Sequence, residues 1–98
     1  MSFRLLFQPE AAEQFGILKG SPGFAARHKA VCRCLGYLET NPRHPGLRTH
    51  KYSHLQGPQG QEVFEAYAQN RTHGAYRVFW YYGPAHGEIT ILAITPHP

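Results

Sequence analysis

The hydrophobic pattern changes period near residue 45, and this change limits the chain to folds that combine helices with an antiparallel sheet. Before it, Phe24, Val31, Leu35 and Leu38 recur at intervals of seven, four and three, which is the spacing of one helix face. After it, short β-branched and aromatic segments alternate with turn residues. A chain of 98 residues is large enough for one hydrophobic core. We therefore expect a single domain over residues 1–98.

The first half of the chain predicts a strand followed by two helices. Residues 2–7 alternate apolar and polar side chains over a strand-like length. Pro9 is tolerated in the first turn of the helix that follows. The second helix starts near Phe24 and stops at Asn41, because a residue before proline avoids the helical region. The Gly- and Pro-rich connection at residues 19–23 makes the two helices a hairpin.

The second half predicts four strands, which we place at residues 47–55, 62–70, 76–82 and 88–95. Short Gly-, Pro- and Asn-containing turns separate them, so neighbouring strands should run antiparallel in a meander. The two amphipathic helices must cover one face of this sheet. The expected fold is α+β with two layers: an N-terminal strand, a helical hairpin, and an antiparallel meander of three to four strands.

Charge favours a polyanionic partner. Ten Lys and Arg against six Asp and Glu give a formal charge of +4, and a basic surface on a small domain suits nucleic acid, a ribosome or an acidic protein. No apolar run approaches the ~20 residues of a membrane span, and the N-terminus lacks the sections of a secretory signal. We expect a soluble, cytoplasmic protein without a membrane partner.

The cysteines and histidines do not predict a metal site or a cofactor. Cys32 and Cys34 fall on different faces of the second helix, so free thiols are expected. Among seven histidines, only His50 and His54 have an i, i+4 spacing. They lie in a strand-like segment, where residues four apart are distant from each other.

The sheet face turned away from the helices should carry the chemistry. Alternation places Phe64, Ala66 and Ala68 on the helix side, so Glu65 and Tyr67 fall on the other. Cations that contact phosphates and rings that stack on bases make an RNA-binding surface. The candidate RNA-binding residues are Arg48, Lys51, Tyr67, Arg71, Phe79 and Tyr81.

Arg77 and His97 mark the two ends of the last strand pair. Because antiparallel strands return on each other, the start of one lies beside the end of the next, so these residues should meet. Pro96 and Pro98 flank His97 and should hold its backbone extended.

Several segments together resemble the RelE/ParE toxin superfamily of type II toxin–antitoxin systems. They are the helical hairpin ending in Asn41-Pro42-Arg43, HPGLRTHKY at 44–52, VFEAYAQNRT at 63–72, AYRVFW at 75–80 and ITILAITPHP at 89–98. The resemblance covers nearly the whole chain. It implies a compact toxin, an antitoxin that wraps it, DNA contact only through the antitoxin complex, and, in RelE-like members, metal-free cleavage of mRNA on the ribosome.

The resemblance also implies roles for individual residues. Arg77 corresponds to a catalytic phosphate binder, His97 to a general acid or supporting cation, and Arg71 to a loop arginine. The sequence departs from RelE-like members in having Tyr67 and Gln69 where they carry lysines, and in lacking a C-terminal tyrosine or helix after Pro98. The role of general base is then left to Glu65 or His50. The catalytic candidates are Arg77, His97 and Glu65.

The chemistry of metal-free RNA cleavage suits these side chains. A 2′-hydroxyl attacks the adjacent phosphorus, which needs a base, a cation on the phosphorane oxygens and an acid at the leaving 5′-oxygen. Arg77 can bind phosphate bidentately, and the imidazole of His97 can donate a proton near neutral pH. Two alternatives need no such residues: a ParE-like, non-enzymatic inhibitor of DNA gyrase, and an inactive toxin relic that only binds its antitoxin.

Overall fold

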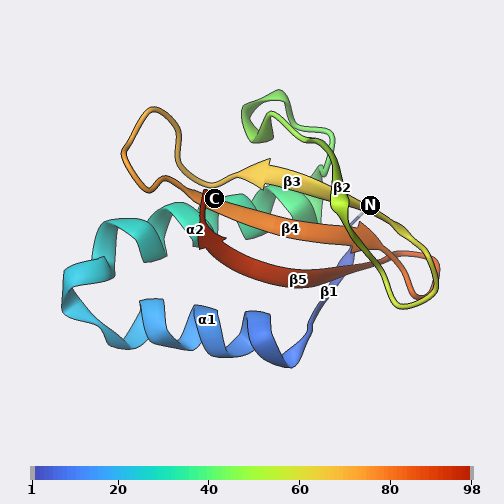
Figure 1. The fold of residues 1–98 in the computed structure, drawn as a ribbon, viewed down its shortest axis with the longest axis horizontal. Coiled ribbons are helices and arrows are strands. Elements are labelled where there is room, and N and C mark those ends of the chain that lie inside the picture. The colour runs from blue at the N-terminus through green and yellow to red at the C-terminus, as the bar shows by residue number, and fades with distance from the viewer. Residues whose placement is uncertain (1, 98) are drawn as a thin grey trace.

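The computed structural model describes residues 2–97, whose five strands form one sheet in the order β1-β5-β4-β3-β2 (Figure 1). The elements, in chain order, are β1 (Arg4–Phe7), α1 (Pro9–Gly20), α2 (Ala25–Thr40), β2 (His50–Gln56), β3 (Glu62–Tyr67), β4 (Tyr76–Tyr82) and β5 (Glu88–Pro96). Short 3-10 turns occur at Pro22–Phe24 and Pro45–Leu47. The predicted α+β order and the antiparallel meander from β2 to β5 are confirmed.

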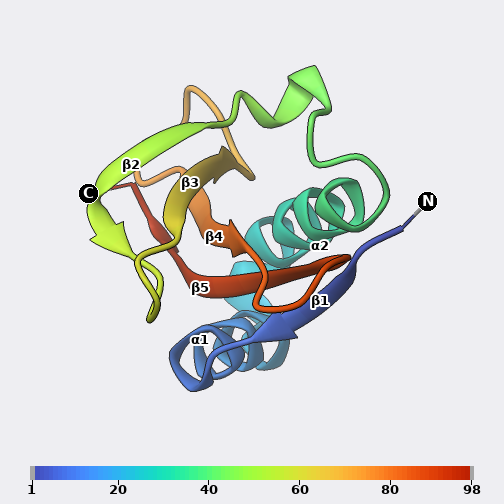
Figure 2. The same cartoon turned by 90° about the vertical axis from the view of Figure 1, so that its right-hand side faces the viewer.

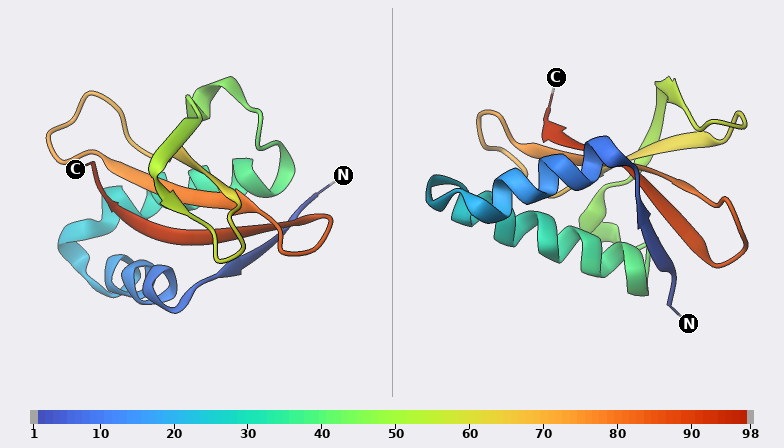
Figure 3. Two further views of the ribbon diagram at one scale, coloured as in Figure 1. Left: turned by 45° about the vertical axis from the view of Figure 1, so that its right-hand side comes forward. Right: turned by 90° about the horizontal axis from the view of Figure 1, so that it is seen from below.

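Both helices lie on one face of the sheet, which gives the fold its two layers (Figures 1 and 3). The apolar stripe of α2 supplies Val31 and Leu38 to the main core, where they meet Val78 and Trp80 of β4. From β5, the isoleucines at 89, 91 and 94 complete this layer. The predicted spacing of the α2 stripe therefore identifies the side of the helix that is buried.

The first strand joins the last one. β1 pairs in parallel with β5, from Arg4 opposite Glu88 to Phe7 opposite Ile91, so β5 lies between β1 and β4 (Figure 2). Two predicted boundaries are wrong. Leu47 ends a 3-10 turn and is buried instead of starting a strand, and β3 ends at Tyr67 rather than at residue 70.

A β-bulge in β5 changes which side chains face the helices. Trp80 pairs with Ile91 and Phe79 pairs with Ala93, so Leu92 is an extra residue in β5. A bulge of this kind breaks the alternation of side chains along a strand. As a result, Ile91 and Ile94 both reach the main core, and residues 93, 95 and 97 fall on the outer face, the sheet face opposite the helices.

The middle of the outer face is covered rather than open. The edge strand β2 crosses over this face (Figures 1 and 3), and the ring of Tyr52 lies 4.8 Å from that of Phe79 between centroids. A second apolar cluster forms beneath it from Val63, Phe79 and Tyr81. The expectation that Phe79 and Tyr81 present their rings to RNA is therefore wrong, because both are buried.

No helix within residues 2–97 has both the length and the apolar character needed to cross a membrane.

Candidate functional site

A buried carboxylate, that of Glu65, lies at the end of the sheet where β4 begins and β5 ends. Its side chain is 2% exposed. His50 Nε2 lies 2.7 Å from Glu65 Oε1. On the other oxygen, Oε2, His97 Nδ1 lies at 3.3 Å and Arg77 Nε at 3.6 Å. We call these four side chains the carboxylate cluster.

Strand register explains why these residues meet. His50 is directly opposite Glu65 across the β2–β3 pair, and opposite residues on one sheet face have their Cβ atoms about 4.5–5.5 Å apart. Arg77 is opposite Tyr67 on β3 and Thr95 on β5. The N–H of His97 donates to the Ala75 carbonyl at 2.7 Å, which continues the pairing past β5. Pro98 lies outside the described residues.

Arg77 is held on several sides at once. Its guanidinium carbon lies 3.7 Å from the centroid of the Tyr67 ring, and Nη1 donates to the carbonyl oxygens of Gln69 at 2.7 Å and Tyr76 at 3.3 Å. Nε faces the Glu65 carboxylate at ion-pair rather than hydrogen-bond distance. The side chain is 7% exposed. A phosphate would therefore meet a cation whose orientation is already fixed.

The two histidines are the accessible members of the cluster. The side chain of His50 is 49% exposed and that of His97 is 51% exposed, although both contact the buried carboxylate. Arg77 offsets the charge of Glu65, so each histidine that gains a proton makes the site more positive. Such a site favours an anionic ligand when the histidines are protonated.

Some of the predicted RNA-binding residues lie at the carboxylate cluster and others lie away from it. Tyr67 lies in the site under Arg77, and Arg71 is exposed in the loop between β3 and β4, at the same end of the sheet. Lys51 is opposite Phe64 and pairs with Glu62 at 3.2 Å. Because strand side chains alternate, Lys51 faces away from its neighbour His50.

Arg48 is also outside the cluster. Its side chain lines a pocket with Phe64 and Trp80, which belong to the helix side of β3 and β4. Only its backbone reaches the cluster, where the carbonyl oxygen lies 3.3 Å from His50 Nδ1. Two of the predicted RNA-binding residues, Arg48 and Lys51, therefore lie apart from Arg77 and His97.

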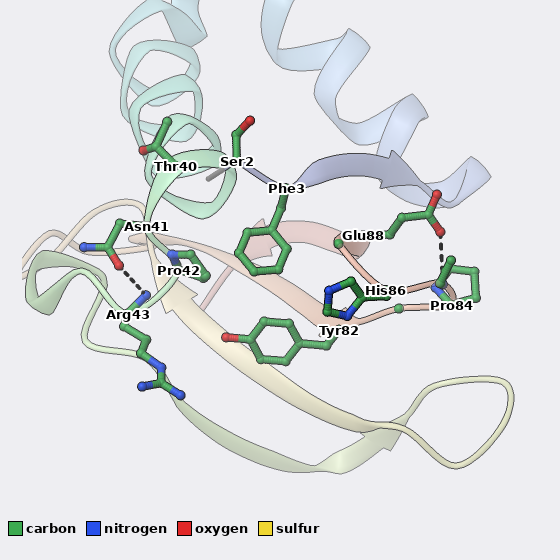
Figure 4. Close-up of a pocket in the computed structure, with 13 residues that line it drawn as sticks. Ser2, Phe3, Thr40, Asn41, Pro42, Arg43, Tyr82, Pro84, His86 and Glu88 are labelled. Atoms are coloured by element: carbon green, nitrogen blue, oxygen red, sulfur yellow. Dashed lines mark hydrogen bonds between the residues drawn. The ribbon is translucent and has the colours of Figure 1, made fainter.

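A cavity lies at the opposite end of β4 (Figure 4). It has a volume of about 670 Å³, and Phe3, Pro42, Tyr82 and Pro84 supply much of its apolar wall. The polar groups drawn there already bond locally: Glu88 Oε1 accepts from the Ala85 N–H at 3.0 Å, and Asn41 Oδ1 from the Arg43 N–H at 3.2 Å. The carboxylate cluster is the candidate functional site, because its ionisable groups converge on one another.

Sequence reasoning underestimated His50. The sequence suggested His50 only as an alternative to Glu65 for the general base, although His50 makes the shortest contact to Glu65 in the structure. The signal was present in the alternation, since a histidine opposite Glu65 on the neighbouring strand must share its sheet face. Within residues 2–97, no three His, Cys, Asp or Glu side chains are arranged to hold a metal ion.

Comparison with solved structures identifies the fold as that of RelE/ParE-like toxins. RelE in the archaeal RelE-RelB complex from Pyrococcus horikoshii OT3 is 20% identical, with a TM-score of 0.65 over 98% of this chain and 96% of that one. A YoeB/ParE toxin from Agrobacterium tumefaciens is 7% identical, with a TM-score of 0.70 over 97% and 99%. YoeB from Staphylococcus aureus, solved as a dimer, is 14% identical, with a TM-score of 0.65 over the full length of both chains.

The likeness is one of fold. No family model matches the sequence, and no curated protein matches it either.

Proposed function

We propose that this protein is the toxin of a type II toxin–antitoxin system and that it cleaves mRNA on the ribosome without a metal ion. One observation carries the proposal: a fixed arginine and an accessible histidine, Arg77 and His97, converge on Glu65 at one end of a sheet whose fold is that of RelE/ParE-like toxins. Phosphate binding and proton transfer are the two functions that RNA cleavage requires from side chains.

The proposed reaction is transfer of the phosphoryl group to the neighbouring 2′-hydroxyl. The 2′-oxygen loses its proton to the general base, Glu65 or His50, and bonds to phosphorus. The bond from phosphorus to the 5′-oxygen then breaks, and that oxygen gains a proton. The products are a 2′,3′-cyclic phosphate and a 5′-hydroxyl. Arg77 stabilises the charge on the phosphorane oxygens, and His97 donates the proton to the leaving oxygen. Tyr67 and Arg71 contact the RNA on either side of this linkage.

The proposed protein partner is an antitoxin encoded with the toxin. The similar fold of RelE in a complex with RelB supports this expectation. DNA is then contacted only through the toxin–antitoxin complex. Co-expression with the neighbouring open reading frame should suppress growth arrest and give a complex that co-purifies in a fixed ratio.

The test is induction of the wild-type protein and of His97→Ala, followed by mapping of mRNA ends. The wild type should create new 5′-hydroxyl ends within translated regions, and His97→Ala should reduce their number at equal protein level. His54→Ala is the matched control, because His54 is an exposed histidine on β2 that packs on Tyr52 at a ring distance of 5.3 Å. Intact mRNA in wild-type cells would contradict the proposed cleavage.

The role of Arg77 is tested with lysine rather than alanine, because the Arg77 side chain is buried beside Glu65 and alanine would leave that carboxylate without its cation. Arg77→Lys keeps the charge but loses the planar guanidinium, whose Nη1 bonds to the Gln69 and Tyr76 carbonyls fix its orientation. We expect strongly reduced cleavage with a folded protein.

A non-enzymatic inhibitor of DNA gyrase is the second candidate. Two observations favour it. Nη1 of Arg77 already donates hydrogen bonds to two backbone carbonyls, and Tyr67 and Gln69 occupy positions where RelE-like toxins carry lysines. This candidate predicts loss of supercoiling by purified gyrase and intact mRNA. An inactive relic predicts neither effect, with antitoxin binding retained.

A further inference from the structure

We propose that Gln69 is a positioning residue for Arg77. It follows β3 directly, and through a β-bulge at that point it fixes which nitrogen of the Arg77 guanidinium faces a phosphate. The inference rests on the proposed function for what Arg77 does to RNA. Its own evidence is separate, since it is a set of hydrogen bonds that joins residues 68–69 to residues 76–77.

Pairing between β3 and β4 becomes irregular just after Tyr67. Tyr67 lies opposite Arg77, so regular pairing would place Ala68 alone opposite Tyr76. Instead, the N–H groups of Ala68 and Gln69 both donate to the Tyr76 carbonyl oxygen, each at 3.2 Å. Two consecutive residues opposite a single one form a β-bulge, which often changes the direction of the chain beside a functional site. The backbone of Gln69 therefore takes an orientation that regular pairing would not give it.

The side chain of Gln69 stabilises this bulge. Its Oε1 accepts a hydrogen bond from the Tyr76 N–H at 3.1 Å, so a side-chain oxygen satisfies a donor that usually bonds to the backbone of the next strand. An N–H group that loses its acceptor inside a protein is costly, which favours keeping this contact. The backbone carbonyl of Gln69 is then available to Arg77, whose Nη1 donates to it at 2.7 Å.

These contacts decide which nitrogen of Arg77 a ligand meets. Nη1 donates to the carbonyl oxygens of Gln69 and Tyr76, and Nε faces the Glu65 carboxylate. The Tyr67 ring supports one face of the guanidinium. Nη2 is the nitrogen that these contacts leave for a phosphate. If the bulge relaxed, Nη1 would lose its shortest hydrogen bond and the guanidinium could rotate.

Positioning and direct RNA contact make opposite demands on the Gln69 side chain. A positioning residue needs an acceptor for the Tyr76 N–H, whereas a residue that touches an RNA phosphate needs a donor or a cation. Gln69→Glu keeps the acceptor and adds a negative charge. Gln69→Lys removes the acceptor and adds a positive charge. Gln69→Met removes the acceptor at similar length and without a charge.

The first test is the cleavage of RNA at saturating substrate. Gln69→Met and Gln69→Lys should both lower kcat, by up to ~10²-fold, which is the loss that a misplacement of about 1 Å can cause. Gln69→Glu should keep kcat near the wild type, with its charge raising KM instead. Gln56→Met is the matched control, because Gln56 is an exposed glutamine on β2, and it should change neither value.

Other orders of activity contradict the proposal. If Gln69→Lys is the most active of the three variants and Gln69→Glu the least, the side chain contacts RNA directly. If all three variants lose kcat equally, or none does, the acceptor at Oε1 is not what matters.

The orientation of Arg77 can also be measured without RNA. Nuclear magnetic resonance gives separate signals for the Nη protons of a guanidinium when hydrogen bonds slow its rotation, and Arg77→Lys identifies these signals by removing them. They should be separate in the wild type, Gln69→Glu and Gln56→Met, and they should merge in Gln69→Met while the rest of the spectrum remains that of a folded protein. Merged signals in the wild type, or separate ones in folded Gln69→Met, would overturn the proposal.

The two proposals fail in different ways. If the wild type cleaves no RNA, with or without ribosomes, while the Arg77 signals depend on Gln69 as expected, the ribonuclease function is wrong and the positioning of Arg77 stands. If the wild type cleaves RNA and Gln69→Met matches it in kcat and in the Arg77 signals, the ribonuclease function stands and the role of Gln69 is wrong.

Discussion

His97 and Glu65 are 32 positions apart in the sequence, and His97 Nδ1 lies 3.3 Å from Glu65 Oε2. The bulge at Leu92 makes this contact possible. With strict alternation from Ile89 and Ile91, residue 97 would face the helices. The extra residue shifts the later positions of β5 to the outer face, so that a histidine beyond the strand end reaches a carboxylate two strands away.

Removing the charge of Arg77 should destabilise the fold through Glu65. Arg77→Met leaves a buried carboxylate without its permanent counter-charge, which typically costs about 3–5 kcal/mol. The double variant Glu65→Gln/Arg77→Met should recover much of this loss, because neither charge then remains buried. Urea unfolding of both variants measures the difference.

Arg33→Met is the control for this comparison, because Arg33 is an exposed cation on α2. It should change the free energy of unfolding by less than about 0.5 kcal/mol. If the double variant is no more stable than Arg77→Met alone, Glu65 is not the source of the cost.

The Tyr67 ring should stabilise the Arg77 guanidinium through its face rather than its hydroxyl. The guanidinium carbon lies 3.7 Å from the ring centroid, a geometry that contributes about 0.5–2 kcal/mol. Tyr67→Phe should therefore unfold close to the wild type in urea, and Tyr67→Leu should be less stable by that amount. In an Arg77→Met background the two substitutions should differ much less. Equal costs for Phe and Leu would point to the hydroxyl instead.

The core under the sheet should be sensitive to loss of volume at Leu38. This residue is fully buried between α2 and the sheet, and a buried Leu→Ala change costs about 2–5 kcal/mol. Leu55→Ala is the matched control, since Leu55 is 41% exposed on β2. Thermal unfolding should show a large decrease for the first variant and little change for the second.

The two cysteines should differ in reactivity. Burial raises the pKa of the Cys34 thiol from 9.0 to about 12, so this group stays protonated at pH 8, and the thiolate is the reactive form. Cys32 is exposed. Mass spectrometry after brief alkylation at pH 8 should find one label in the folded protein and two in denaturant. Rapid double labelling of the native state would show that α2 opens readily.

Much of the fold could be predicted because its elements have local causes. Pro42 stops α2 and the turns separate the strands, so both could be recognised from neighbouring residues. The meeting of Arg77 and His97 also followed, because antiparallel pairing fixes which strand ends are adjacent. Alternation on β3 correctly placed Glu65 and Tyr67 on the outer face.

The missed features depend on distant contacts. The bulge at Leu92 is set by pairing with β4, and nothing near residue 92 in the sequence marks it. The burial of Phe79 and Tyr81 results from β2 crossing the outer face, with Tyr52 packed on Phe79. Sequence alternation gives the face of a side chain and says little about what covers that face. For this reason Glu65 was predicted to line an open surface, although it is buried.

The position of β5 has a consequence for synthesis. The ribosome makes this strand after the other four, yet it lies between β1 and β4 in the sheet. The first strand therefore has no partner until residues 88–91 have left the exit tunnel, and Arg77 has no neighbouring strand on its β5 side until Thr95 follows. His97 must emerge later still before it can reach Glu65. The carboxylate cluster therefore cannot form before His97 has been synthesised and β5 has paired with β4.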